Sequence, residues 1–128
     1  FNALQAMDVK PAAGKPLRVV DDQILTPTST ADLAEATLRL VEAAPYGLYH
    51  LTNSGQCTWH EFAAAIFEQA GIRADLAPCR TADRQDKARR PDYSVLTTEH
   101  PGPVPRLRPW TVALDDYLAR LRTAGIIS

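Results

Sequence analysis

The sequence predicts an α/β fold, built from three amphipathic helices packed around several short strands. Apolar residues recur at helical spacing near residues 30–44, 58–70 and 110–122, and short β-branched or aromatic runs lie between turn-forming residues. The length of 128 residues is close to the commonest domain size. We therefore expect residues 1–128 to form a single domain.

The composition argues against several classes of protein. Hydrophobic residues make up 45% of the chain and charged residues 23%, which is typical of a folded domain. Fourteen Lys and Arg against 15 Asp and Glu give a net charge of −1, so no overall field attracts nucleic acid or anionic lipid. No apolar run approaches the roughly 20 residues of a membrane span. The two cysteines are too few for a disulfide scaffold, and we expect a cytoplasmic protein that binds neither nucleic acid nor membrane.

The first thirty residues combine a helix end, a strand and a loop. Residues 1–7 have apolar side chains at helical spacing without a cap before them, and we interpret them as the end of a helix in a longer protein. Leu17–Val20 follows a turn with proline and glycine and is partly β-branched, which predicts a strand. Residues 21–30 are polar and interrupted by Pro27, which predicts a surface loop.

The helix near 30–44 has distinct apolar and charged faces. Ser29 or Thr30 supplies its N-cap, and Pro45 follows its end. Residues 48–51 then predict a strand before the next turn. This succession is typical of a β-α-β alternation.

The helix over 58–70 has the clearest start signal in the chain. Thr58 and Glu61 have the spacing of a capping box, in which each side chain bonds the backbone N–H of the other residue. Gly71 marks the helix end.

The pattern weakens between residue 72 and the final helix at 110–122. We expect a short strand near 74–76, a long loop, and an extended segment at 93–96.

Two signatures of dinucleotide-dependent reductases are absent from the sequence. The six glycines are isolated, so no glycine-rich turn is available to a pyrophosphate. None of the four tyrosines has a lysine four positions later, which excludes a Tyr-x-x-x-Lys acid/base pair.

Cys57 and His60 have a spacing that fits the start of a metal site or a nucleophilic Cys-His pair. The other candidate ligands, Cys79, His50 and His100, are scattered. This scatter favours a structural role, and we expect no metal site.

Arg89 and Arg90 are the main candidates for anion binding. Guanidinium groups present planar forks of donors that match phosphate oxygens. The alternative is a solvated charged loop, because Asp83 and Asp86 are near in sequence.

Gln23 and Thr28 offer hydrogen-bonding groups suited to a sugar or amide edge. In a loop that precedes a helix, the alternative for such residues is to cap and turn the chain.

Five segments keep a common order and spacing over nearly the whole chain: Asp22–Thr28, Ala31–Ala36, Gly47–Asn53, Cys57–Ala63 and Arg90–Leu96. As a set they resemble the carboxy-terminal part of dTDP-4-dehydrorhamnose reductases, within the extended short-chain dehydrogenases. The resemblance implies reduction of a dTDP-4-keto-6-deoxy-L-hexulose to dTDP-L-rhamnose with NADPH, often with magnesium, and a homodimer for the full-length protein.

The family's glycine-rich loop and Tyr-x-x-x-Lys pair belong to its amino-terminal Rossmann half. The resemblance therefore implies that this chain is the substrate-binding part alone, with the catalytic half absent, and is inactive by itself. Arg90 and Arg89 are expected to bind the diphosphate of the dTDP-sugar. Gln23 and Thr28 are expected to line the same cleft, and Asn2 to face the catalytic half.

Two functions of other classes stay open. One is a non-catalytic regulatory subunit that resembles the beta subunit of methionine adenosyltransferase. The other is a self-standing binding module. An intact Tyr-x-x-x-Lys pair in the sequence upstream of Phe1 would favour the enzyme.

Overall fold

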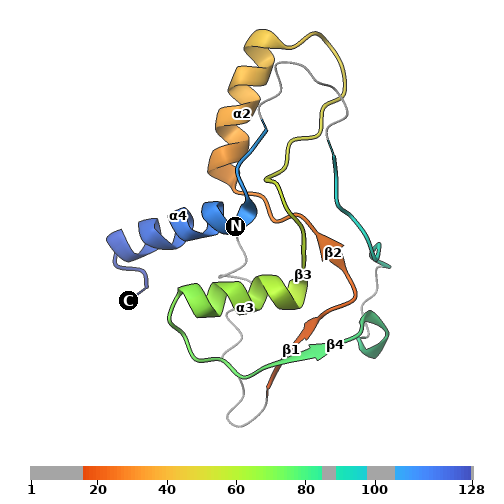
Figure 1. Ribbon diagram of the computed structural model, residues 1–128, viewed down its shortest axis with the longest axis vertical. Coiled ribbons are helices and arrows are strands. Elements are labelled where there is room, and N and C mark those ends of the chain that lie inside the picture. The colour runs from red at the N-terminus through yellow and green to blue at the C-terminus, as the bar shows by residue number, and fades with distance from the viewer. Residues whose placement is uncertain (1–15, 85–88, 98–105, 128) are drawn as a thin grey trace.

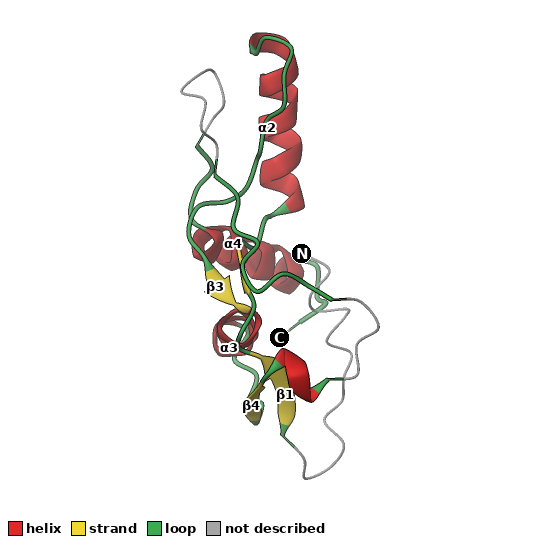
Figure 2. Ribbon diagram, turned by 90° about the vertical axis from the view of Figure 1, so that its right-hand side faces the viewer, coloured by secondary structure: helices red, strands yellow, loops and turns green. Residues whose placement is uncertain are grey.

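A computed structural model describes residues 16–84, 89–97 and 106–127 and confirms the α/β class (Figures 1 and 2). Its elements are β1 (Leu17–Val20), β2 (Ile24–Leu25), α2 (Thr30–Ala43), β3 (Cys57–Thr58), α3 (Trp59–Gln69), β4 (Leu76–Cys79), the 3-10 helix η1 (Thr81–Asp83) and α4 (Trp110–Thr123). The helix end expected over residues 1–7 lies outside the described residues.

The strands form two small sheets. β1 pairs in parallel with β4, with Leu17 opposite Leu76 and Val20 opposite Cys79. β2 pairs antiparallel with β3, and Ile24 also forms a parallel bridge with Tyr93. The second sheet therefore joins three segments that are far apart in the sequence.

The predicted helix starts are confirmed in atomic detail. Ser29 caps α2, where its side chain accepts a bond from the backbone N–H of Asp32. At α3 the capping box is complete: the Glu61 N–H donates to Thr58 Oγ1 at 3.1 Å, and the Thr58 N–H donates to Glu61 Oε2 at 2.7 Å. Each cap satisfies N–H groups that a helix leaves without an internal acceptor.

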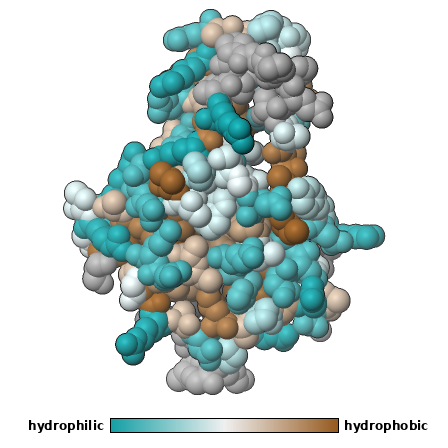
Figure 3. All heavy atoms as spheres, in the orientation of Figure 1, coloured by the Kyte–Doolittle hydropathy of each residue, from teal (hydrophilic) through white to brown (hydrophobic). Residues whose placement is uncertain are grey.

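The hydrophobic core lies between α3 and α4. Phe62 and Trp110 meet edge to face, with ring centroids 5.6 Å apart and an interplanar angle of 79°. Around them lie the other buried members of the cluster, Cys57, Ile66, Ala70, Leu114 and Leu118. On the face shown in Figure 3, the remaining hydrophobic side chains form small patches separated by hydrophilic ones.

Several strand predictions need correction. Residues 48–51 are not a strand, and β4 begins at Leu76 rather than near residue 74. The loop expected over 21–30 contains β2, and of the extended segment 93–96 only Tyr93 is bridged. A strand exists only where a neighbour completes its ladder, and a run of two to four residues does not reveal that neighbour.

α2 stands apart from the body formed by the other helices (Figures 1 and 2). Ala36 is its only buried residue. Among the described residues, no helix combines the length and apolar character that crossing a bilayer requires.

Candidate site beside strand β2

The segment that follows the two candidate arginines is held beside β2 by backbone hydrogen bonds. The Ile24 N–H donates to the Asp92 carbonyl at 2.8 Å, and the Ser94 N–H donates to the Ile24 carbonyl at 2.9 Å. These bonds place the chain that follows Arg90 directly beside the chain that follows Gln23. Segments about 70 residues apart in sequence thus meet at β2.

Arg89 and Arg90 are both exposed. Neither forms an ion pair with an acidic residue of the described ranges. Asp83, which the sequence offered as a neutralising neighbour, is instead bound by Arg18 at 3.0 Å and by the Arg80 N–H at 3.1 Å. Asp86, the other such neighbour, lies outside the described residues. Both arginines thus present guanidinium groups to solvent, with no neutralising carboxylate among the described residues.

Gln23 directly precedes β2 and is buried, with 5% of its surface exposed. Its side-chain amide donates to Thr81 Oγ1 at 3.0 Å. Thr81 in turn donates to the Asp22 carboxylate from its hydroxyl at 2.7 Å and from its backbone N–H at 3.0 Å. These bonds lower the pKa of Asp22 below its ordinary value of 3.8. Gln23 thus links η1 to the loop between β1 and β2 by a hydrogen bond. Its role in substrate binding stays a prediction.

Thr28 lies on the other side of β2, in the loop that leads into α2. Its hydroxyl donates to the Thr26 carbonyl at 3.2 Å and accepts from the Asn53 N–H at 3.4 Å. Asn2 lies outside the described residues. The structure therefore brings Gln23 and the arginine segment to one strand, and places Thr28 three residues beyond that strand.

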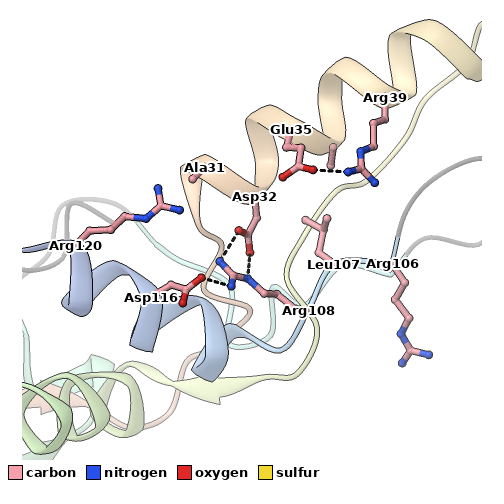
Figure 4. A pocket seen from close by; sticks show the side chains of 10 residues that line it. Ala31, Asp32, Glu35, Arg39, Arg106, Leu107, Arg108, Asp116 and Arg120 are labelled. Atoms are coloured by element: carbon pink, nitrogen blue, oxygen red, sulfur yellow. Dashed lines mark hydrogen bonds and ion pairs between the residues drawn. The ribbon is translucent and has the colours of Figure 1, made fainter.

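A polar cluster at the start of α2 was not predicted from the sequence. The Arg108 guanidinium binds both carboxylate oxygens of Asp32, at 2.8 and 2.9 Å, and also pairs with Asp116 (Figure 4). The bonds with Arg108, supported by Asn53, hold the pKa of Asp32 below its ordinary value of 3.8. The same pairing raises the pKa of Arg108. The bidentate geometry fixes α2 to the chain that enters α4.

Asn53 is the buried centre of this cluster, with 1% of its surface exposed. Its carbonyl oxygen accepts from the Ser29 N–H at 2.7 Å. Its amide donates to Asp32 Oδ2 at 2.8 Å and to the Arg108 carbonyl at 3.0 Å. In the sequence this asparagine belongs to a turn, and nothing local reveals partners 21 and 55 residues away.

A cavity of about 430 Å³ opens between α2 and the chain that leads into α4 (Figure 4). Two of its arginines are neutralised inside the cavity, Arg108 by the carboxylates described above and Arg39 by Glu35. None of Gln23, Thr28, Arg89 and Arg90 lines it. The cavity is therefore a separate feature from the arginine segment beside β2.

Cys57 belongs to the hydrophobic core rather than to a reactive centre. Burial raises the pKa of its thiol to about 12, so the thiol stays protonated near neutral pH. Within residues 16–84, 89–97 and 106–127, no cluster of three His, Cys, Asp or Glu side chains is arranged to hold a metal ion.

The Asp32 pairing leads to a prediction about acid stability. A carboxyl group whose pKa is lowered by folding contributes stability above its unfolded pKa and loses it as the pH falls through the folded pKa. We expect the stability difference between the wild type and Asp32→Asn to be largest above about pH 5 and to shrink below 3.8. Urea unfolding from about pH 6 to pH 2 measures this difference. A difference that is constant over the range would show that Asp32 is not held ionised by its partners.

The sequence of this chain is similar to a known protein family and to several known proteins. Residues 1–123 match the family model described as RmlD substrate binding domain. The spore coat polysaccharide biosynthesis protein SpsK of Bacillus subtilis is 45% identical over 111 residues, which cover 84% of this chain and 38% of that protein. The dTDP-4-dehydrorhamnose reductase of Streptomyces griseus is 41% identical over 113 residues, which cover 80% of this chain and 36% of that protein.

Solved structures that are similar to this chain include two dTDP-4-dehydrorhamnose reductases. A dTDP-4-dehydrorhamnose reductase from Clostridium acetobutylicum matches with a TM-score of 0.77 and 39% identity, over 84% of this chain and 39% of that one. The enzyme from Bacillus anthracis, solved in complex with NADP, matches with a TM-score of 0.75 and 30% identity, over 83% of this chain and 38% of that one. This chain thus spans less than two fifths of the length of these relatives. With the family model matched over nearly its whole length, the chain belongs to the family of RmlD substrate binding domains.

Proposed function

We propose that this chain is the dTDP-sugar-binding part of a dTDP-4-dehydrorhamnose reductase, an enzyme that reduces the 4-keto group of its substrate with NADPH. The family match and the printed names of the relatives support this assignment. NADP in the Bacillus anthracis structure supports the choice of hydride donor. The regulatory and self-standing alternatives have no comparable observation in their favour.

The exposed arginine segment beside β2 is the observation that carries the proposal. A dTDP-sugar presents a diphosphate, and a planar guanidinium donates two parallel bonds to its oxygens. Arg89 and Arg90 are exposed, and the bonds of Ile24 hold the following residues in place. We assign Arg90 to the diphosphate, with Arg89 beside it. Gln23 and Thr28 are assigned to the same cleft.

The residues of this chain do not fit a dinucleotide. A pyrophosphate needs a glycine-rich turn at a helix start, where backbone N–H groups approach it closely. The described glycines with positive φ lie elsewhere: Gly71 and Gly125 follow the ends of α3 and α4, and Gly55 lies against the Trp110 side chain. We therefore assign NADPH to the part of the relatives that this chain does not match.

A comparison of two proteins tests the proposal. We expect the 128-residue chain alone to oxidise no NADPH in the presence of dTDP-4-dehydrorhamnose, because the hydride donor has no site. We expect turnover from a chimera in which this chain replaces the matching 36% of the Streptomyces griseus reductase. Absorbance at the NADPH band measures both. Turnover by the isolated chain, or a folded, NADPH-binding chimera without turnover, would contradict the proposal.

A further inference from the structure

Tyr93 is an exposed aromatic residue that the fold holds in a fixed position. Its backbone lies between the two bonds that join Asp92 and Ser94 to Ile24. Its hydroxyl donates to Gln56 Oε1 at 3.0 Å. The residue is nevertheless 58% exposed, so burial of its ring does not account for this arrangement. A large aromatic face that is held rigidly and left open to solvent is suited to stacking on a flat ligand.

The bond between Tyr93 and Gln56 spans strand β2. On one side β2 pairs with β3, which Gln56 directly precedes. On the other side Ile24 bridges to Tyr93. Because the two side chains meet from opposite sides of the strand, the Tyr93 side chain extends across β2 toward Gln56.

Tyr93 lies close enough to Arg90 for one nucleotide to contact both residues. Three residues span at most about 10 Å of chain. The chain also bends at Asp92, which shortens this distance. In a nucleoside diphosphate only the ribose separates the base from the diphosphate. A ligand whose diphosphate binds Arg90 therefore reaches the Tyr93 ring with its base.

The chemistry of the substrate decides which of its ends lies on this chain. In a dTDP-sugar, the diphosphate joins the hexose to thymidine. The hexose carries the 4-keto group and must lie beside the nicotinamide, which is assigned to the part of the relatives that this chain does not match. With the diphosphate at Arg90, the thymidine end is therefore the one that this chain binds.

We propose that Tyr93 and Gln56 form the thymine site of this chain, in which the base stacks on the Tyr93 ring and Gln56 Nε2 donates to O4 of the base. The Gln56 carbonyl oxygen holds the Tyr93 hydroxyl, and Nε2 has no acceptor among the described residues. The inference rests on the proposed function, because that function supplies the dTDP-sugar.

The direction of the nucleotide accounts for the choice of O4. The ligand runs from Arg90 across β2 to Gln56, so the edge of the base that is remote from the ribose meets the amide. In thymine this edge carries O4, which accepts a hydrogen bond. Cytosine carries an amine at the same position, and two donors would then face each other. The site therefore selects thymine over cytosine.

Calorimetric titration of the Streptomyces griseus chimera with dTDP and with dCDP tests the site, with NADP present to occupy the dinucleotide site. We expect dTDP to bind at least about ten-fold more tightly than dCDP, because the mismatched donors lose their hydrogen bonds. The titration does not depend on turnover. A chimera that shows this selectivity without turnover would remove the proposed function and leave the thymine site standing.

Tyr93→Ala is expected to weaken dTDP binding by about 5- to 100-fold, because the base loses its stacking partner. Tyr46→Ala is the control, because Tyr46 is also an exposed tyrosine but lies in the chain after α2. We expect it to leave the affinity for both nucleotides unchanged.

Gln56→Glu is expected to reverse the preference, so that dCDP binds more tightly than dTDP. Glutamate keeps the length of the side chain but offers only acceptors, which repel O4 of thymine and accept from the amine of cytosine. If the pair of Tyr93 and Gln56 were purely structural, the variant would change the melting temperature but not this preference. The ratio of two dissociation constants measured on one protein is also independent of how much of it is folded.

Equal affinity of the wild-type chimera for dTDP and dCDP would overturn the inference, as would an unchanged affinity for dTDP in Tyr93→Ala. A higher KM for dTDP-4-dehydrorhamnose in Tyr93→Ala, without a change in the affinity for dTDP, would place the ring against the hexose and would also overturn it. Turnover by the chimera in any of these cases would leave the proposed function standing.

Discussion

Asn53→Ala is expected to lower the free energy of unfolding by about 3 kcal/mol. The substitution leaves the buried Ser29 N–H without its acceptor and removes one donor from Asp32. It also removes one of the two donors of the Arg108 carbonyl, which keeps its bond from the Ser54 N–H. Each buried group left unsatisfied costs about 1–3 kcal/mol. Urea unfolding of the isolated chain at neutral pH measures the change.

Gln56→Ala is the matched control for this experiment. Gln56 is a nearby exposed amide that accepts one bond, from the Tyr93 hydroxyl at 3.0 Å. We expect its loss to change stability by less than about 0.5 kcal/mol. A comparably small effect of Asn53→Ala would show that the cluster does not hold α2 to the rest of the chain.

Arg90→Ala in the Streptomyces griseus chimera is expected to raise the KM for the dTDP-sugar by about ten-fold to more than one-hundred-fold. The physical reason is the loss of a charge-assisted contact worth roughly 1.5–3 kcal/mol. The affinity for NADPH should not change, because the dinucleotide is assigned to other residues. Arg90→Lys should raise the KM for the dTDP-sugar less than Arg90→Ala does, since lysine keeps the positive charge but cannot form the bidentate contact.

Steady-state kinetics with a melting curve separates this effect from unfolding. Arg73→Ala is the control, because Arg73 is exposed and lies in the loop after α3. An unchanged KM for both Arg90 variants would remove Arg90 from the site and favour a merely solvated loop.

Local sequence signals were sufficient to predict where the helices α2 and α3 begin. The N-cap at Ser29 and the capping box of Thr58 and Glu61 depend on residues within three positions, so sequence reasoning placed these starts correctly. The parallel pairing of β1 with β4 depends on residues about 60 positions apart. The β-branched run after a turn predicted the first of these strands, but local signals could not place the second strand in register.

The polar cluster shows the limit of sequence reasoning most clearly. Asp32 belongs to the charged face of the helix near 30–44, and Arg108 lies just before the final helix, where the sequence pattern is weak. Their bidentate contact spans 76 positions and exists only because the fold brings α2 and the start of α4 together. For Arg89 and Arg90 the prediction rests on residue chemistry, and the structure adds only their location, because the backbone bonds of Ile24 hold the chain after Arg90 beside β2. Their role in binding stays a prediction.

A crystal structure of the chimera with bound dTDP tests the assignment of the site most directly. We expect guanidinium nitrogens of Arg90 within about 2.7–2.9 Å of diphosphate oxygens, with the nucleotide lying along the segment beside β2. The competing location is the cavity between α2 and α4, which is lined by Arg39, Arg106, Arg108 and Arg120. A diphosphate bound there, with Arg90 free in solvent, would contradict the account.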